Sequence, residues 1–560
     1  MTDTPRTAPA PIDAARVDTV HRAARVHTPD GAPATVLATA GEMIVAVGGE
    51  ELLDAVPAGA HRVEHGDATL VPGLVDVHNH VLVAGRAELA ELRLPGDAGV
   101  DALLDAVARR AAGLPEGAWL VGGGWDCGLL DALAAPGVLA RLDTAAGHRP
   151  VLLRDDSCHN RWVSSAALDR AGISADTPDP AGGRILRDAD GRSPAGVLVE
   201  AAAVAVERVC AADGDGVDDA EAVRHAVGIL HSHGVTGFQD AASSLPLLQA
   251  LHRLDAEDRL DAWAVTSMPV LDPVFGSAPV GAELVERALP LAGRRHRPTF
   301  VKVFLDGIPP SRTAAFLDPY LPDDAHGDDW RGHTAMTTEE LTGHLLGLAA
   351  MGIGAKVHCT GDRSVRVFLD AVAAVRAAGH TGTRFHLAHG QYVADADLGR
   401  LAALGVVADL SPALWFPSPV VDAICACVPR GRAQRIHPNR DLLRSGVLLA
   451  VGSDWPVVGS PDPWPGLQGL VTRADPTGTA PGRLWPEQAL TPAEALHAAT
   501  LGAARAAGID DVTGALTPGR AADLAVLDAD PLTVPHDEIA GTRVLATWFA
   551  GREVYRREHG

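Results

Sequence analysis

Residues 71–80 read VPGLVDVHNH, an apolar run that follows a Pro–Gly turn and ends in two histidines. Turn residues followed by valine and leucine are typical of the start of a β-strand. His78 and His80 are two residues apart, so on a strand their side chains point to the same side. At the carboxyl end of a barrel strand, both could reach one metal ion. A histidine-rich surface loop is the alternative interpretation of this segment.

Seven further runs of strand character follow, separated by Ala-rich stretches with helical character. This alternation predicts βα units and a parallel sheet, and eight strands are the number that closes a barrel. The sequence therefore predicts an α/β fold, a (β/α)8 TIM barrel. The eight expected strands are 74–79, 235–240, 263–268, 301–305, 354–358, 384–389, 405–410 and 448–453.

The two ends of the chain differ from its middle, because both contain short alternating runs broken by turn residues. We expect residues 1–70 and 505–560 to form one small β-sandwich beside a barrel that spans 71–504. The first two expected strands are separated by residues 81–230, too many for one helix and its loops. We interpret this stretch as an inserted lid or substrate subdomain over the barrel mouth.

Composition excludes several classes of partner. The 560 residues carry 47 basic and 71 acidic side chains, a formal net charge of −24, which disfavours nucleic acid and anionic membranes. No apolar run is long enough for a membrane span and no signal peptide is recognisable, so the expected location is the cytoplasm. The partner expected is a small-molecule substrate; a homodimer is compatible with the sequence, which leaves the oligomeric state open.

Later strand ends add further candidate metal ligands. His358, His389 and Asp454 follow three of the expected strands, and Lys302 lies within a fourth. Histidine and carboxylate together suit zinc or a related divalent ion. Only two lysines, Lys302 and Lys356, occur among the 47 basic residues, which suggests that an amine is needed where one remains.

Taken together, these segments resemble the amidohydrolase superfamily, in particular its YtcJ-like branch, which includes N-substituted formamide deformylases. The resemblance covers about residues 15–558. The matching segments are VPGLVDVHNH (71–80), HNRWVSSAALDRAGI (159–173), GVTGFQDA (234–241), VKVFLDGIPPSRTAAFLDPY (301–320), VHCTGDRSV (357–365), HLAHGQYV (386–393), GSDWPV (452–457), LTPAEALHAATLGAARAAG (490–508) and GALTPGRAADLAVLD (514–528).

The resemblance implies a role for each ligand candidate. His78 and His80 would bind the more buried metal, and His358 and His389 the second. Asp454 would be both a ligand and the general base. Lys302 would be N-carboxylated and bridge the two ions, a reaction that the permanently protonated arginine cannot undergo. An unmodified Lys302 is the alternative, and one metal ion or two remain open.

The expected reaction is hydrolysis of a C–N bond. A divalent ion generates hydroxide near neutral pH and polarises the carbonyl group. Asp454 would accept the proton of the water and pass it to the departing nitrogen. Two alternatives stay open. The same site could serve deamination, ester or lactone hydrolysis, decarboxylation or isomerisation, or the scaffold could be a non-catalytic binding protein.

Substrate contacts are the least constrained part of the prediction. His159 matches a histidine that the family carries in its insertion, whereas Ser164 stands where relatives often have asparagine. Arg312 could meet a carbonyl or carboxylate group. Aromatic residues on expected loops could bind an apolar group, with ordinary loop packing as the equal alternative. These aromatic residues are Trp125, Trp415, Phe416 and Trp455.

Overall fold

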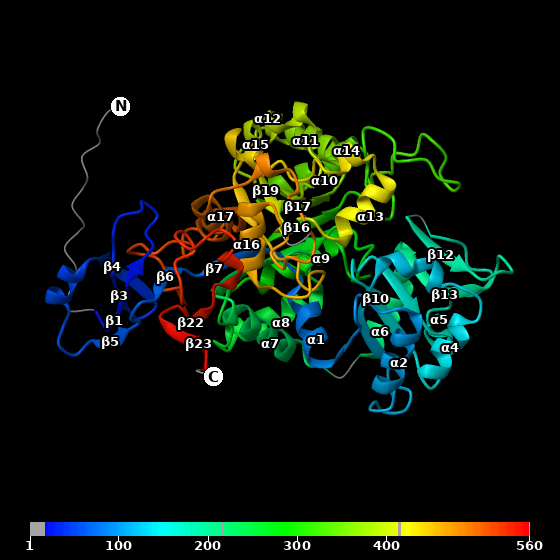
Figure 1. Ribbon diagram of the computed structural model, residues 1–560, viewed down its shortest axis with the longest axis horizontal. Coiled ribbons are helices and arrows are strands. Elements are labelled where there is room, and N and C mark those ends of the chain that lie inside the picture. The colour runs from blue at the N-terminus through cyan, green and yellow to red at the C-terminus, as the bar shows by residue number, and fades with distance from the viewer. Residues whose placement is uncertain (1–16, 181, 215–216, 413–415, 559–560) are drawn as a thin grey trace.

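The computed structural model describes residues 17–180, 182–214, 217–412 and 416–558 (Figure 1). Its centre is an eight-stranded sheet in the order β20-β19-β18-β17-β16-β15-β14-β7, with every neighbouring pair parallel. All eight strands predicted from the sequence are present, which confirms the (β/α)8 barrel. The strands are β7 (Leu74–Asn79), β14 (Val235–Asp240), β15 (Trp263–Pro269), β16 (His296–Phe304), β17 (Gly354–Cys359), β18 (Phe385–His389), β19 (Val406–Leu410) and β20 (Leu449–Val451).

Strand β16 is longer than expected, because it begins at His296 rather than at residue 301. Its first residues, His296 and Arg297, pair with Ala264 and Val265 of β15. This polar beginning lacks the apolar pattern by which the strand was identified. Pairing with the neighbouring strand therefore extends β16 beyond its apolar run.

The barrel closes where β7 meets β20. The amide of Asp454 donates to the carbonyl of His78 at 2.7 Å, and the amide of His80 donates to the carbonyl of Trp455 at 2.8 Å. Gly452 makes this approach possible, because a Cβ atom at that position would lie 2.4 Å from the Cβ of His78. The closure therefore brings the ends of the first and last strands directly together.

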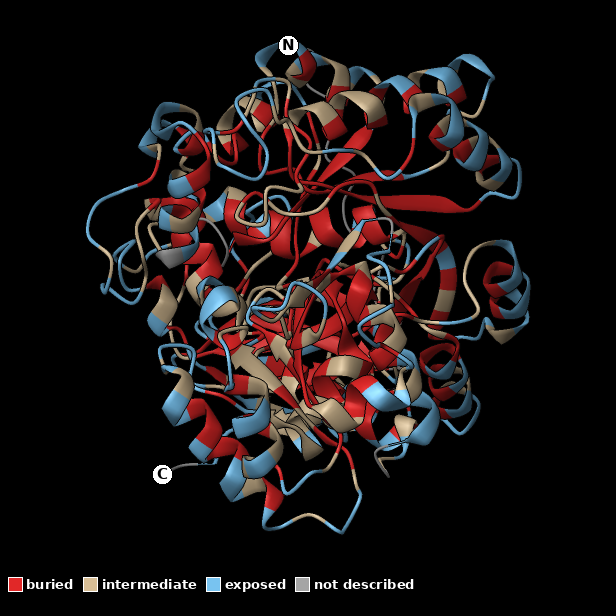
Figure 2. Cartoon of the chain, turned by 90° about the vertical axis from the view of Figure 1, so that its right-hand side faces the viewer, coloured by how far each residue is buried: buried red, intermediate tan, exposed pale blue. Residues whose placement is uncertain are grey.

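Helices surround the barrel, and the strands inside it are almost wholly buried (Figure 2). Helix α11 (Asp362–Ala377) shows the pattern, since it buries Val365, Phe368, Leu369 and Val372 at spacings of three and four residues. Helix α10 (Thr338–Ala350) begins with a capping box between Thr337 and Glu340. None of the helices in the described part of the chain is long and apolar enough to cross a membrane.

Two sheets at one end of the molecule form the small β-domain (left in Figure 1). Their shared core includes Leu37, Leu70, Leu524 and Trp548. The described C-terminal strands all lie in the second sheet, where β6 pairs antiparallel with β21 and Pro72 lies opposite Leu524. An isolated bridge between Met43 and Ala521 joins this segment to the first sheet. The first sheet contains β4 (Met43–Gly48), β3 (Val36–Ala40), β1 (Thr19–Arg22) and β5 (His61–Glu64); the second contains β2 (Arg25–Val26), β6 (Thr69–Pro72), β21 (Leu524–Leu527), β22 (Val544–Phe549) and β23 (Arg552–Arg556).

The segment between β7 and β14 folds around a sheet of its own, at the opposite end of the molecule (right in Figure 1). Helices α1 (Val81–Ala90) and α7 (Asp219–Ser232), at its two ends, pack against each other, and α7 also packs on β14. The division into 1–70 with 505–560, 71–504 and an insertion over 81–230 stays a prediction. The strands of this sheet, in spatial order, are β12 (Gly183–Arg187), β13 (Pro194–Glu200), β11 (Asn160–Val163), β10 (Val151–Asp155), β9 (Leu120–Trp125) and β8 (Leu92–Arg93).

Candidate metal centre

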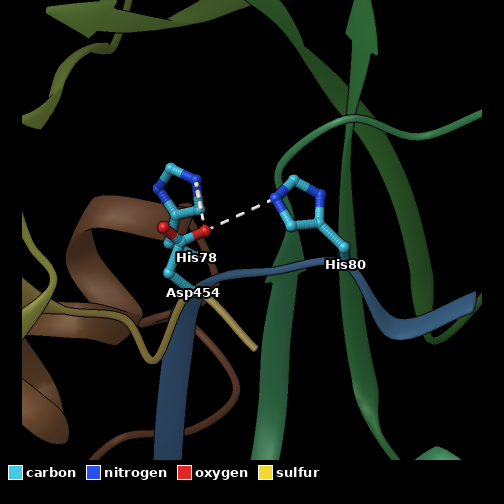
Figure 3. A group of neighbouring side chains, drawn as sticks. All are labelled: His78, His80 and Asp454. Carbon is cyan, nitrogen blue, oxygen red and sulfur yellow. Dashed lines mark ion pairs between the residues drawn. The ribbon is translucent and has the colours of Figure 1, made fainter. Parts of the chain in front are cut away.

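Three predicted ligands converge where β7 and β20 end (Figure 3). The Nε2 atoms of His78 and His80 lie 3.7 and 3.4 Å from Oδ1 of Asp454. One ligand atom from each of these three residues lies within 4.8 Å of the other two, close enough to hold one metal ion. The ring nitrogen Nδ1 of His80 is buried without a hydrogen-bond partner. Histidine nitrogens and a carboxylate are ligands that zinc accepts, so the donor set fits a divalent ion.

The three remaining candidates surround this group. His389 at the end of β18 has its Nδ1 3.9 Å from Oδ2 of Asp454, and its ring centroid is 4.7 Å from that of His358. Nζ of Lys302 lies 3.4 Å from Nε2 of His78. Nε2 of His358 lies 3.1 Å from the carbonyl oxygen of Gly307. The structure thus brings together all six residues that the sequence singled out as metal ligands.

Two properties of this cluster are typical of functional sites: an unusual backbone conformation and deep burial. His389 and Asp454 have φ values of 67° and 60°, a left-handed conformation that is uncommon outside glycine and recurs at functional sites. Burial lowers the pKa of His78, His358 and His389 well below the ordinary value, which favours the neutral form that binds a metal. Burial also lowers the pKa of Lys302 to about 8. The lowered pKa increases the fraction of neutral amine, which is the form that can add carbon dioxide.

Asp454 remains ionised inside this buried cluster. Burial alone would raise the pKa of its carboxyl group, but the facing rings of His78, His80 and His389 hold that pKa well below the ordinary value. The side chain is 7% exposed, and it faces the same cavity as the histidines. The structure therefore places a negatively charged oxygen at the centre of the candidate metal site.

Sequence reasoning missed a buried ion pair that supports His78. Oδ2 of Asp409, on β19, lies 2.8 Å from Nδ1 of His78 and also accepts from Nζ of Lys356. Lys356 donates in addition to the carbonyl oxygen of Val77 at 2.8 Å. A carboxylate on one ring nitrogen fixes the tautomer and orientation of a histidine ligand. The signal in the sequence was a lone aspartate in the apolar strand VVADL, which requires a partner once buried.

A cavity of about 410 Å³ opens over the cluster, and the six candidates line its floor. His159 of the insertion lines it as well, with its Nδ1 2.8 Å from Oε2 of Glu200. Burial lowers the pKa of His159, but the Glu200 carboxylate more than offsets this and raises that pKa above the ordinary value. The rest of the wall is mainly apolar, formed by Val274, Phe275, Phe304, Ile308, Pro309, Ile424 and Val457 among others.

Several predicted substrate contacts do not reach this cavity. Trp125 is fully buried in the core of the insertion, where its Nε1 donates to the carbonyl of Leu153. Trp455 is 1% exposed and packs in the barrel core, so it meets the site only through its backbone. Arg312 is paired with Asp323 at 2.8 Å.

The expected site included two further aromatic residues, and two buried aspartates lie at strand ends near it. Phe416 does not line the cavity within the described chain, and Trp415 lies outside the described residues. Asp240, the last residue of β14, accepts from the amide of Val81 after β7 and from the hydroxyl of Ser243. Asp306, just after β16, accepts from the amide of Ala315 and from the hydroxyl of Ser364 after β17. Neither carboxylate lines the cavity, and each joins segments that follow two neighbouring strands.

Comparison with known proteins places this architecture. The chain is 30% identical over 541 residues to the N-substituted formamide deformylase of Arthrobacter pascens, covering 94% of this chain and 95% of that protein. It is 28% identical over 515 residues to the putative amidohydrolase YtcJ of Bacillus subtilis, covering 88% and 89%. A crystal structure of an uncharacterized metal-dependent hydrolase from Pyrococcus horikoshii superimposes with a TM-score of 0.73 at 22% identity, covering 92% and 99%. Residues 66–555 match the model of the amidohydrolase family, and the chain therefore belongs to this family of hydrolases.

Proposed function

We propose that this chain is a metal-dependent hydrolase that cleaves the C–N bond of an amide or N-substituted formamide. The observation that carries the proposal is the convergence of six candidate ligands, from five strand ends, on the floor of one cavity. The printed activity of the Arthrobacter pascens relative, at 30% identity over nearly the whole chain, supports the type of bond. The substrate is a small molecule that fits the cavity of about 410 Å³.

The proposed ligand set divides between two ions, zinc or another divalent metal. His78 and His80 would hold one ion, His358 and His389 would hold the other, and Asp454 would be a ligand as well. Lys302, if carboxylated, would supply two further oxygen ligands, which its position against Nε2 of His78 supports. When bound, the metal lowers the pKa of a water molecule and polarises the carbonyl group.

The side chains of this chain have distinct tasks in the reaction. Asp454, ionised at the centre of the site, accepts the proton of the attacking water through a carboxylate oxygen. Asp409 and Lys356 hold the ring of His78 in a fixed orientation. The apolar wall formed by Phe275, Phe304 and other residues excludes water and accommodates an apolar N-substituent.

The substrate contact proposed here is His159, because it lines the cavity, whereas Trp125, Trp455 and Arg312 are excluded by their positions. We also propose a cytoplasmic location. It is supported by five cysteines that form no disulfide in the described chain, as is usual in a reducing compartment: Cys127, Cys158, Cys359, Cys425 and Cys427.

Metal content is the first test. The protein is purified without chelator in bicarbonate buffer, and its metal is counted by elemental mass spectrometry. About two ions per chain would support the bridged site. About one ion per chain would indicate that Lys302 is an unmodified amine. A chain that takes up no metal would contradict the proposal.

Activity is the second test. A panel of formamides, amides, esters and amino-heterocycles is scored for released amine, acid and ammonia. Turnover of amides or formamides should collapse in Asp454→Ala and persist in Asp329→Ala, an exposed aspartate outside the cavity. Release of ammonia alone would favour deamination instead.

A further inference from the structure

We infer that His159, held by Glu200, is a catalytic residue that donates a proton to the departing nitrogen. This inference rests on the proposed function and deepens it, because it divides two proton transfers between two walls of the cavity. Asp454 on the barrel accepts the proton of the water. His159 on the insertion supplies the proton that the leaving group needs.

The position of His159 is the first argument. It immediately precedes β11 of the insertion and lines the same cavity as the metal cluster. Its ring centroid lies 6.2 Å from that of His358, which we propose as a metal ligand. A substrate whose carbonyl group faces the metal cluster therefore has His159 within reach of its other side.

Glu200 fixes the ring of His159 through a dedicated arrangement. The amide of Glu200 donates to the carbonyl of His159 at 2.9 Å, so the two backbones are paired, while Oε2 meets Nδ1 at 2.8 Å. The other carboxylate oxygen, Oε1, accepts from the hydroxyl of Thr313 at 3.2 Å. Thr313 belongs to the barrel loop after β16, so Glu200 connects insertion and barrel at the cavity.

The backbone of Glu200 is itself unusual. Its φ is 51° and its ψ is −127°, outside the regions that residues with a side chain prefer. Such conformations cost about 1–3 kcal/mol and persist where the surroundings hold them, often at functional sites. The strained residue is the one whose carboxylate contacts His159. A turn with only a structural role would not need strain at this residue.

Charge balance gives His159 its proton. Glu200 is 8% exposed, and within the described chain its only ion-pair partner is His159. A buried carboxylate is costly unless a cation compensates it, so the pair favours an imidazolium. Because Nδ1 donates to Glu200, the proton on Nε2 is the one available to a ligand in the cavity.

The chemical step balances with these groups. Water adds its oxygen to the carbonyl carbon and gives one proton to Asp454. The C–N bond then breaks, its electron pair moves to nitrogen, and the proton on Nε2 of His159 joins that nitrogen. The amine departs neutral instead of as an unstable amide anion, and the acid product remains. Asp454 then returns its proton through solvent, which restores the imidazolium.

The test uses leaving groups of different basicity. Wild type, His159→Asn and Glu200→Gln, each loaded with metal, hydrolyse N-substituted formamides whose amines range from benzylamine to nitroaniline. Basic amines need protonation to leave, whereas nitroaniline needs it least. For His159→Asn we expect kcat to fall about 10²- to 10⁴-fold on the benzylamine substrate and less than about tenfold on the nitroaniline substrate. Glu200→Gln should show the same trend with a smaller loss.

Each outcome decides a separate point. An equal loss for all leaving groups, or none, would overturn the role of His159 as proton donor. Metal content and circular dichroism should match wild type, and Thr313→Val should keep the wild-type dependence on leaving group because Glu200 still meets His159. If wild type with full metal hydrolyses no member of the series, the proposed function itself is contradicted and the assignment falls with it.

Discussion

Replacing Lys356 by methionine should strongly destabilise the barrel, even though the two side chains have similar length. The ammonium group of Lys356 and the carboxylate of Asp409 are each 0% exposed in the structure. Removing one partner of a buried pair leaves an uncompensated charge and costs about 3–5 kcal/mol. At about 1.4 kcal/mol per tenfold change, this is roughly a hundred- to several-thousand-fold change in the unfolding equilibrium.

A second variant separates charge from packing. In Lys356→Met/Asp409→Leu the buried pair becomes apolar, and most of the lost stability should return, because such replacements are often neutral. Metal affinity should nevertheless stay about 10- to 100-fold low, since His78 no longer has the carboxylate that orients its ring. In the double variant, therefore, stability should recover while metal affinity stays low.

Urea unfolding of the metal-free proteins, followed by circular dichroism, measures the first quantity, and metal competition with a coloured chelator measures the second. A loss below about 1 kcal/mol in Lys356→Met, the scale of an exposed pair, would refute the reasoning. So would a double variant that is no more stable than the single one.

Three further predictions concern the metal site and the β-domain. Asp454→Asn should lower kcat about 10²- to 10⁴-fold without changing the circular dichroism spectrum, because the amide cannot accept the proton of the water; near-normal turnover would contradict the assigned base. Lys302→Arg should reduce the metal content from two ions to one by elemental mass spectrometry, and two retained ions would exclude the carbamate bridge. Burial raises the pKa of Asp523 to about 6 from 3.8, so the folded state binds its proton more tightly and wild type should lose stability as pH rises from about 4 to 6. The shift of about two pKa units corresponds to about 3 kcal/mol of stability. Thermal melts of Asp523→Asn across this pH range should lack this loss of stability. A pH dependence equal to that of wild type would contradict the role given to Asp523.

Local pattern was sufficient for the barrel. Each strand contains a short apolar run, and His78 and His80, at and just beyond the end of β7, pointed to the site before any contact was known. Strand order in a barrel follows chain order, so ligand candidates at later strand ends could be placed near the same mouth. Position at or near a strand end therefore pointed to six residues that meet in one cavity, and their roles as ligands stay a prediction.

Long-range packing explains what the sequence left undecided. Trp125 ends a strand, as a mouth residue could, but the helices of the insertion bury it. Arg312 finds its partner in Asp323, eleven residues away, and nothing in the sequence distinguishes this carboxylate from that of a substrate. Glu200 meets His159 only because β13 and β11 are neighbours, and β13 pairs with β12 on its other side.

The pairing of β6 with β21 sets an order of events during synthesis. Pro72 of β6 lies opposite Leu524, so about 450 residues leave the ribosome between the two strands. At about 5–20 residues per second, β6 waits roughly 20–90 seconds for its partner. During this time the edge of β6 is open, and until β20 has emerged β7, which follows β6 directly, has no closed barrel to enter. A nascent chain stalled before residue 524 should therefore bind chaperones through this edge, and release should follow the emergence of β21.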